Sequence, residues 1–221
     1  MGRRYDLVAF DMDGVLLNHT SSWTWVHDAF GVDNDASLME FLSGKIDEKE
    51  FMRRDIALWR TIDPAVSIRT IAGYLKDIPL IGGIQETVAA LRWNGIRTVI
   101  ISGGIDIAAE MLFSEFGFDD RAANGLETDA EGRLTGEGII NVDLTDKGKK
   151  LREFMERFGT VPERTVSIGN SSTDIKMFEN SGLSIAFNPI DDTTKDSADH
   201  VIYSSNISDV LGIILEVEDR E

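Results

Sequence analysis

The sequence contains no cysteine, which excludes disulfide bonds, thiol catalysis and thiolate metal sites. Its three histidines, His19, His27 and His200, lack the spacing of a zinc motif, so we expect them to pack or to lie at the surface. No apolar run approaches the roughly 20 residues that a membrane-spanning helix needs. The stretch before Asp6 is too short for a signal peptide, so we expect a cytoplasmic protein that uses no membrane.

Basic residues are also few. The chain has 22 Lys and Arg against 39 Asp and Glu, which gives a net charge of −17. Nucleic acids and anionic membrane surfaces are bound by clustered Lys and Arg, so the charge argues against both as partners. With 42% hydrophobic and 28% charged residues, the rest of the composition is typical of a soluble globular protein. An acidic chain that binds a phosphate needs a metal ion or a few well-placed bases at its site.

Short β-prone runs alternate with helical patterns along most of the chain. This alternation predicts an α/β fold with a Rossmann-like, doubly wound parallel sheet, whose ligands bind beyond the carboxyl ends of the strands. A turn around residues 129–132 indicates a hairpin. The expected strands are 5–10, 96–101, 165–168, 183–187 and 200–203, and the expected helices are 84–93, 106–116, 147–158, 173–180 and 206–217.

Residues 21–76 interrupt the alternation, because their apolar residues recur at helical spacing and little there resembles a strand. We interpret this stretch as a compact helical insertion, with Pro79 and the glycines after it marking the return to the main body. The predicted organisation is a catalytic core of residues 1–16 and 80–221, and a helical domain of residues 17–79 inserted after the first strand.

Asp11 and Asp13 follow the first predicted strand, and Gly14 comes directly after them. Two carboxylates at this spacing can direct one side chain at a substrate phosphorus and hold the other beside it. Asp11 would then be the nucleophile, and Asp13 the general acid for the leaving oxygen and later the base for water. The alternative is an acidic loop that only caps a strand.

Three further segments carry polar groups at the ends of strands or the starts of helices. Ser102 and Gly103 close a strand, and a hydroxyl with backbone N–H groups at a helix start suits a phosphate oxygen, although such turns are also ordinary. Lys147 can neutralise charge on a phosphoryl group, or it can simply be solvated. The oxygens from Asn170 to Asp174 can complete a shell for Mg²⁺, or they can serve only as helix caps.

Taken together, these segments resemble the haloacid dehalogenase superfamily of phosphatases, and among them most closely the phosphoserine phosphatases. The resemblance spans nearly the whole predicted core, from Phe-Asp-x-Asp-Gly at 10–14 through Ser-Gly-Gly at 102–104 to the stretch 169–188. It implies hydrolysis of a small phosphorylated metabolite through an aspartyl-phosphate, under a cap that excludes water. An Asp at position 13 favours phosphatase or phosphomutase chemistry within this superfamily.

The resemblance also implies the ligands of a Mg²⁺ ion. They are the Asp11 side chain, the Asp13 backbone carbonyl and Asn170, with Asp174 binding directly or through water. The phosphate would be bound by Ser102, Gly103 and Lys147.

Three positions depart from the family pattern. Asn170 stands where the family has Asp, so its amide oxygen can ligate Mg²⁺ without adding charge, and we expect weaker metal binding. Thr20 replaces a Glu that meets the substrate amine, and it becomes a candidate substrate contact. An apolar residue near Leu58 replaces an Arg that binds the substrate carboxylate, and Arg53 and Arg54 are weaker candidates for that contact. Since a missing partner is costly at a charged site, phosphoserine itself is not predicted as the substrate.

Two other functions stay open at this point. A phosphomutase of the same superfamily would return the phosphoryl group to its substrate instead of to water. A catalytically impaired phosphate-binding or regulatory protein is suggested by Asn170, although the presence of both Asp11 and Asp13 argues against it. The expected partner is a small phosphate ester, and the chain would act as a monomer or a homodimer.

Overall fold

The fold is built on one seven-stranded sheet, seen in a computed structural model that describes residues 4–215. The strand order is β4-β3-β2-β1-β5-β6-β7, and every neighbouring pair is parallel except β3 and β4. The predicted α/β class with a mostly parallel sheet is therefore confirmed. The strands are β1 Leu7–Phe10, β2 Arg97–Ile105, β3 Asp120–Thr128, β4 Leu134–Ile139, β5 Thr165–Gly169, β6 Leu183–Phe187 and β7 His200–Ile202.

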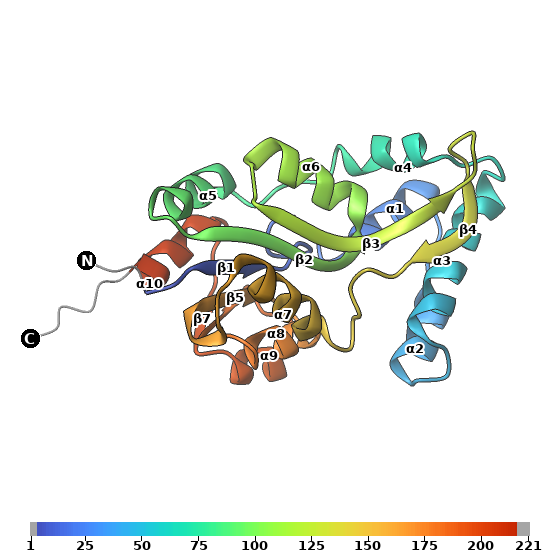
Figure 1. Cartoon of the computed structure of the whole chain (residues 1–221). Coiled ribbons are helices and arrows are strands. Elements are labelled where there is room, and N and C mark those ends of the chain that lie inside the picture. Colours follow the sequence, from blue (N-terminus) through green and yellow to red (C-terminus); the bar gives the residue numbers. More distant parts are fainter. Residues whose placement is uncertain (1–3, 216–221) are drawn as a thin grey trace, which may run out of the picture.

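Helices cover both faces of this sheet (Figure 1). The cartoon shows α5 and α6 on one face and α7, α8 and α9 on the other. The helices after the first strand are α1 Ser22–Phe30, α2 Asp35–Leu42, α3 Glu48–Ile62 and α4 Ile68–Leu75. The remaining helices are α5 Ile84–Trp93, α6 Asp106–Phe116, α7 Lys147–Phe158, α8 Ile175–Phe178, α9 Asp192–Ser197 and α10 Val210–Leu215.

The central strand β1 is buried on both faces, which explains its continuous apolar sequence. Val8 and Phe10 belong to the hydrophobic core that includes α5 and α6, whereas Leu7 and Ala9 pack with α7 and α8. Because β2 and β5 pair with opposite edges of β1, the strand order reverses there. The carboxyl end of β1 is therefore the point at which an open α/β sheet binds its ligands.

Strand β2 extends beyond the predicted end at residue 101. It continues to Ile105, because it resumes pairing with β3 after an irregularity, so that Ile105 lies opposite Asn124. The expectation that Ser102 and Gly103 open a helix is therefore wrong, since α6 begins only at Asp106. At the other end of the chain, the expected helix 206–217 starts as a short 3-10 turn and continues as α10 to Leu215, and its last two residues lie outside the described range.

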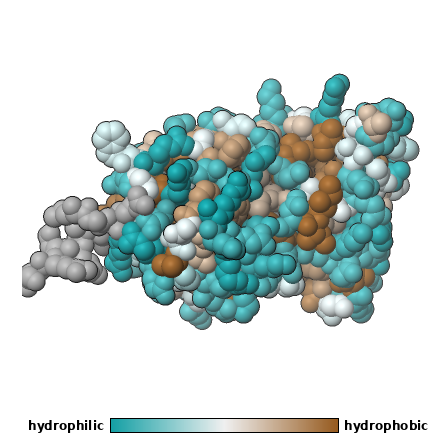
Figure 2. Space-filling view, in the orientation of Figure 1, coloured by the Kyte–Doolittle hydropathy of each residue, from teal (hydrophilic) through white to brown (hydrophobic). Residues whose placement is uncertain are grey.

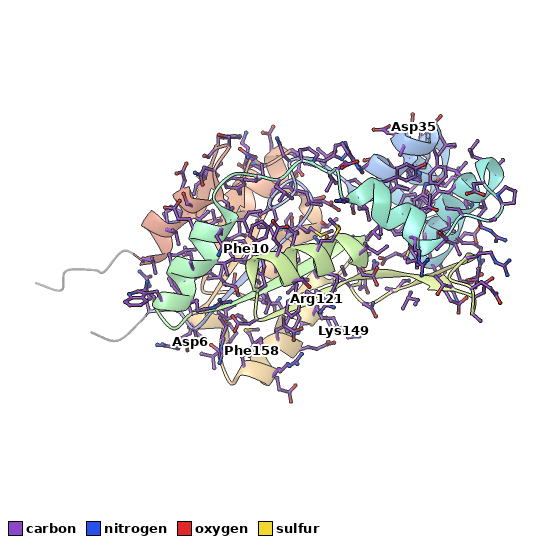
Figure 3. All side chains as sticks on the ribbon, turned by 90° about the horizontal axis from the view of Figure 1, so that it is seen from above. Asp6, Phe10, Asp35, Arg121, Lys149 and Phe158 are labelled. Atoms are coloured by element: carbon purple, nitrogen blue, oxygen red, sulfur yellow. The ribbon has the colours of Figure 1, made fainter. Side chains whose placement is uncertain are left out.

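The stretch between β1 and α5 is helical, as predicted, and we refer to residues 17–79 as the cap segment. Its separation as a domain stays a prediction. Figure 3 shows α2, marked by Asp35, at the opposite end of the molecule from Asp6.

The hairpin of β3 and β4 reaches the cap segment, with its turn where the sequence predicted one. Gly132 N donates to Asp129 O at 3.0 Å within the turn, and Ile68 N donates to Gly132 O at 2.9 Å from the cap segment. Leu134 N donates to Val66 O at 2.9 Å. The core therefore contacts the cap segment through a hairpin as well as through the chain connections at its two ends.

The surface is mainly hydrophilic on the face drawn in Figure 2, with hydrophobic patches toward the right-hand half of the view. The charge composition, in which acidic residues outnumber basic ones by 39 to 22, agrees with this surface. Between residues 4 and 215, no helix has both the length and the apolarity needed to cross a bilayer.

Candidate active site

The predicted site residues meet at the carboxyl edge of three adjacent strands. Asp11 follows β1, and its N–H donates to Ile168 O of β5 at 2.8 Å. Asn170 follows β5, and Ser102 lies near the end of β2 on the other side of β1. Lys147 is the first residue of α7, so it enters the site from a helix start.

Lys147 joins two carboxylates in a buried cluster. Its Nζ donates to Asp11 Oδ1 at 2.9 Å and to Asp174 Oδ1 at 2.7 Å, and all three side chains are almost fully buried. The alternative of a solvated lysine is therefore wrong. The second oxygen of Asp174 accepts from the backbone N–H groups of Asn170 at 2.9 Å and Ser171 at 3.0 Å. Asp174 thus caps the start of the 3-10 turn Ser172–Asp174, to which it belongs, and orients Lys147 at the same time.

The cluster carries an excess of negative charge. Burial raises the pKa of Asp11 to about 7; the charge of Asp174 adds to this effect, while Lys147 opposes it. Burial opposes the charge of Lys147 too, but Asp11 and Asp174 outweigh it and raise the lysine pKa above its usual value. Lys147 therefore stays an ammonium ion, and one cation faces two carboxylates in a site that also holds Asp13.

Asp13 is held by Ser22, which sequence reasoning missed. Ser22 N donates to Asp13 Oδ1 at 2.8 Å, and Ser22 Oγ donates to Asp13 Oδ2 at 3.1 Å. The same Oγ accepts from Ile105 N at 3.0 Å, which ties the start of α1 to the end of β2. No local sequence pattern relates Ser22 to Asp13, because their contact depends on α1 beginning beside the end of β2.

The electrostatics of Asp13 suit a proton-exchanging group. Burial raises its pKa to about 6, although the hydrogen bonds from Ser22 oppose the rise. A carboxyl that titrates close to neutral pH can give up and recover a proton during turnover, as general acid–base catalysis requires.

Two glycines permit the close contacts around Asp13. A Cβ at Gly104 would lie 2.4 Å from Asp13 Oδ2 and 2.5 Å from Ser22 Oγ. A Cβ at Gly14, which has a positive φ of 76°, would lie 1.9 Å from Asn170 Nδ2. The Asn170 amide therefore packs directly on the Asp11–Gly14 loop.

Ser102 and Gly103 form a second wall of the site. Ser102 Oγ accepts from Gly104 N at 3.0 Å, so its own O–H proton is left to donate to a ligand. Trp23 Nε1 of α1 donates to Gly103 O at 3.1 Å, which fixes the orientation of the peptide. The Leu144 side chain covers Gly103, since a Cβ there would lie 2.1 Å from Leu144 Cδ2.

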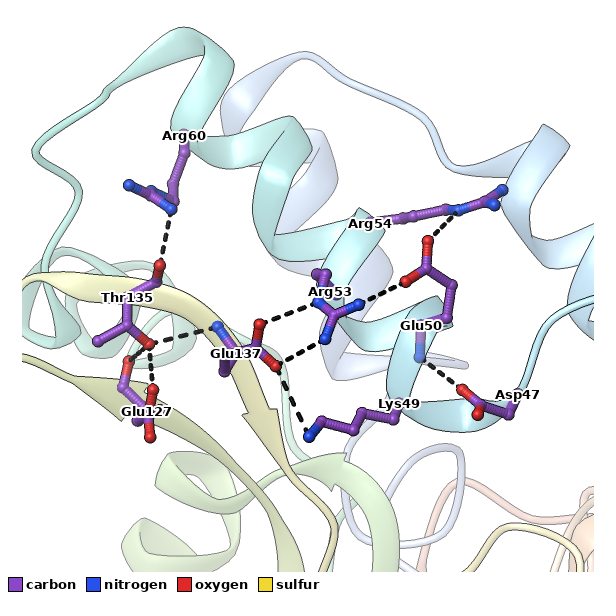
Figure 4. A network of polar contacts seen from close by, with 9 residues as sticks. All are labelled: Asp47, Lys49, Glu50, Arg53, Arg54, Arg60, Glu127, Thr135 and Glu137. Atoms are coloured by element: carbon purple, nitrogen blue, oxygen red, sulfur yellow. Dashed lines mark hydrogen bonds and ion pairs between the residues drawn. The ribbon is translucent and has the colours of Figure 1, made fainter.

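The side chains that were candidates for substrate contacts are not part of the buried cluster. Thr20 is exposed in the turn before α1, and Leu58 is half-buried on α3. Arg53 pairs with Glu137 at 2.9 Å and with Glu50 at 2.8 Å, in the network of Figure 4. Arg54 pairs with Glu40 at 2.7 Å and with Glu50 at 3.0 Å. Both guanidinium groups are thus engaged by carboxylates of the protein.

A metal site is not evident from the usual residue types alone. Within residues 4–215, no group of three or more His, Cys, Asp or Glu is arranged to hold a metal ion. Asn170 supplies an amide in the loop after β5, where a third carboxylate would complete such a group with Asp11 and Asp174. The available donors are therefore oxygens of carboxylate, amide and backbone carbonyl groups, which are the donors that Mg²⁺ accepts.

Comparison with known families agrees with this geometry. The model of the haloacid dehalogenase-like hydrolases matches residues 8–179, which include every site residue discussed above. The chain belongs to this family. The resemblance seen in the sequence motifs is confirmed, and this haloacid dehalogenase-like hydrolase is an enzyme of the phosphatase type.

Two of its relatives are named phosphoserine phosphatases. The phosphoserine phosphatase of Methanocaldococcus jannaschii is 30% identical over 220 residues, covering 97% of this chain and 100% of the relative. The phosphoserine phosphatase of Archaeoglobus fulgidus is 29% identical over 215 residues, and the match spans 96% of this chain but 60% of that longer protein.

Solved structures show the same fold. A substrate-bound phosphoserine phosphatase complex superposes with a TM-score of 0.81 at 27% identity, covering 96% of this chain and 99% of the other. A phospho-aspartyl intermediate analogue of phosphoserine phosphatase superposes with a TM-score of 0.80 over the same shares. This haloacid dehalogenase-like hydrolase therefore shares its whole architecture with phosphatases.

Proposed function

We propose that this chain hydrolyses a small phosphate monoester through an aspartyl-phosphate formed on Asp11. The observation that carries the proposal is the buried cluster in which Lys147 donates hydrogen bonds to Asp11 and Asp174. Asp13 lies beside this cluster and accepts hydrogen bonds from Ser22. A relative with the same fold has been captured as a phospho-aspartyl intermediate analogue, which supports this reaction type.

In the first step, the Asp11 carboxylate attacks phosphorus while the bond from phosphorus to the ester oxygen breaks. Asp13 donates its proton to the departing alkoxide, and a pKa of about 6 keeps part of the population protonated near neutral pH. The Ser102 hydroxyl, the backbone at Gly103 and Lys147 would bind the phosphoryl oxygens. These groups act by position and charge, on which phosphoryl transfer mainly depends.

In the second step, Asp13 takes a proton from water, and the oxygen of that water attacks the phosphorus of the aspartyl-phosphate. The bond from phosphorus to Asp11 breaks, inorganic phosphate is released and Asp11 returns as a carboxylate. Asp13 is protonated again at the end of this step and is ready for the next ester.

The residues that would hold Mg²⁺ are Asp11 and Asn170 through their side chains, Asp13 through its backbone carbonyl, and Asp174 either directly or through water. The donor types fit this ion, and the negative charge that raises the pKa of Asp11 is a local reason for a cation to bind. When bound, the ion would neutralise charge on the phosphoryl group. Because Asn170 adds no charge, we expect turnover to need more Mg²⁺ than a site with a third carboxylate.

The substrate is proposed only as a small phosphorylated metabolite. Named relatives of this chain act on phosphoserine, but Thr20 is exposed here and Arg53 and Arg54 are engaged by protein carboxylates. These positions leave phosphoserine as one ester among those to test.

The deciding experiment measures phosphate release from a panel of esters, including phosphoserine and p-nitrophenyl phosphate, with Mg²⁺ titrated. Asp11→Asn is the matched control, because it keeps the size of the side chain and removes the nucleophile. Metal-dependent release that is lost in the control supports the proposal. Transfer of the phosphoryl group to a second hydroxyl would support a mutase instead. Stabilisation by phosphate without turnover at any Mg²⁺ concentration would indicate a binding protein.

A further inference from the structure

Glu48, the first residue of α3, reaches from the cap segment to two segments of the core. Its Oε1 accepts from Asn124 Nδ2 at 2.9 Å, and its Oε2 accepts from Leu144 N at 3.1 Å. The side chain is half-buried, and burial raises its pKa while the Leu144 N–H opposes the rise. The carboxylate therefore depends on donors of the core for its stabilisation.

The Asn124 partner is itself fixed by the segment that leads to Lys147. Its Oδ1 accepts from Asn141 N and Val142 N, each at 2.9 Å, and the side chain is almost fully buried. Since two N–H groups occupy Oδ1, the amide cannot turn over, and Nδ2 must face Glu48. The same Nδ2 lies 3.5 Å from Gly103 O, on the wall that would bind phosphate.

The Leu144 partner lies three residues before Lys147 along the chain. Its side chain rests on Gly103, as the close approach of Leu144 Cδ2 to that glycine shows. A single carboxylate of the cap segment thus contacts two residues, Asn124 and Leu144, that both lie against Gly103, and Leu144 belongs to the segment that leads to Lys147.

The site is closed in this arrangement. Five residues of the cluster are each at most 4% exposed, and Asp13 beside them is half-buried; the five are Asp11, Ser102, Lys147, Asn170 and Asp174. An open groove of about 890 Å³ lies outside it, between the cap segment and the core, and Glu48, Leu144 and Thr173 are among its lining residues. The contacts of Glu48 with the core therefore lie between this groove, which Glu48 and Leu144 line, and residues that pack on the site.

The other polar contacts between α3 and the hairpin are made by exposed side chains, whereas the buried Met52 of α3 packs on Gly138 of β4. Figure 4 shows Arg53 and Lys49 on Glu137, at 2.9 and 3.9 Å, and Arg60 donating to Thr135 O at 2.8 Å. None of these contacts involves Glu48, so release of the Glu48 carboxylate would leave them as links between α3 and the hairpin.

We propose that Glu48 is a positioning residue that latches the cap segment onto the core and, through the same contacts, fixes residues 141–146 so that Lys147 is placed for catalysis. Closing of the site and placement of the lysine are then one event. The consequence for catalysis rests on the proposed phosphatase function, whereas the contact itself does not.

The first test is Glu48→Gln, with Glu50→Gln as the matched control. A glutamine keeps one acceptor but turns an N–H₂ group toward Asn124 Nδ2 or Leu144 N, which are both donors. Among residues 4–215, the Glu50 carboxylate forms ion pairs only with Arg53 and Arg54 of its own helix. Since a hydrogen bond to a charged group is lost, we expect kcat for p-nitrophenyl phosphate to fall about tenfold in Glu48→Gln. The activity of Glu50→Gln should stay at the wild-type level.

The second test restores the contact with reversed polarity. Asn124→Asp alone places two carboxylates against each other, whereas Asn124→Asp with Glu48→Gln gives the glutamine N–H₂ an acceptor and leaves its oxygen for Leu144 N. The carboxylate introduced at position 124 keeps its other oxygen as the acceptor for Asn141 N and Val142 N. The double variant should therefore recover at least part of the kcat that Asn124→Asp loses.

Hydrogen exchange of residues 141–147, measured by mass spectrometry on the folded proteins, needs no turnover. Exchange of these residues should be faster in Glu48→Gln than in the wild type or in Glu50→Gln. It should be slower in the double variant than in Asn124→Asp alone. Equal exchange in Glu48→Gln and Glu50→Gln, or a double variant no better than Asn124→Asp, would overturn the latch. If the wild type hydrolyses no ester, the proposed function fails, and the exchange data decide on the latch alone.

Discussion

Replacing Asn170 by Asp tests whether this residue ligates a metal ion. The amide is 4% exposed and packs on the Asp11–Gly14 loop, so a carboxylate in its place would be buried beside Asp11 and Asp174. The charge of Asp174 already helps to raise the pKa of Asp11. Without a metal ion, the added charge has no partner and should destabilise the fold.

The expected cost in the absence of metal is about 2 kcal/mol, as is usual for a polar change that leaves a buried group uncompensated. For a chain of this size, that cost lowers Tm by about 4–8 °C. With Mg²⁺ in large excess, the third carboxylate should tighten binding about tenfold, which restores about 1.4 kcal/mol relative to the wild type. The gap in Tm should then narrow by about 3–6 °C.

The assay is thermal unfolding of both proteins in EDTA and in saturating Mg²⁺, followed by circular dichroism. Asn94→Asp serves as the control, because it adds the same charge at an exposed position after α5. A gap between Asn170→Asp and the wild type that is identical with and without Mg²⁺ would refute the assignment of Asn170 as a ligand. The phosphatase proposal would then need a metal site without this residue.

Three further changes test the electrostatics of the site. Lys147→Met should abolish phosphate release and cost about 3–5 kcal/mol in chemical denaturation, because Asp11 and Asp174 are left as unpaired buried charges; a stable variant would contradict the cluster. Because the pKa of Asp11 is raised to about 7 from 3.8, the folded state binds more protons than the unfolded state between these values. In EDTA, the stability of the wild type relative to Asp11→Asn should therefore fall as the pH rises from about 4 to 7, and a pH-independent difference would exclude the shift. Ser22→Ala removes a hydrogen bond that lowers the pKa of Asp13, so the limb of the pH–rate profile near pH 6 should shift to higher pH. If the position of this limb does not change, a group other than Asp13 is responsible for it.

The sequence was sufficient for the strands β1, β2, β5, β6 and β7 and for the residues that lie directly after them, but not for the pairing of β3 with β2. The run before Asp11 is apolar throughout because β1 is covered on both faces, and that pattern can be recognised without coordinates. The ends of parallel strands lie at one edge of the sheet, so Asp11, Ser102 and Asn170 could be expected to meet. The start of α7 at Lys147 was also predictable from its helical pattern.

The partners of these residues could not be predicted, because they depend on which distant segments come into contact. Ser22 meets Asp13 only because α1 begins beside the end of β2. Glu48 and Leu144 are 96 positions apart, and no local pattern relates them. The end of β2 was misjudged for a similar reason, since pairing with β3 carries the strand past two glycines that would otherwise suggest a turn.

The hairpin of β3 and β4 affects how the cap segment could be exchanged between related proteins. Met52 of α3 packs so closely on Gly138 of β4 that a Cβ there would lie 2.4 Å from Met52 Cε. A chimaera that replaced residues 17–79 alone would place a foreign helix on this surface and on the backbone pairing at Gly132. The unit that can be inherited or transplanted is thus discontinuous in sequence, and it joins the helices α1 to α4 to a hairpin encoded much later in the chain.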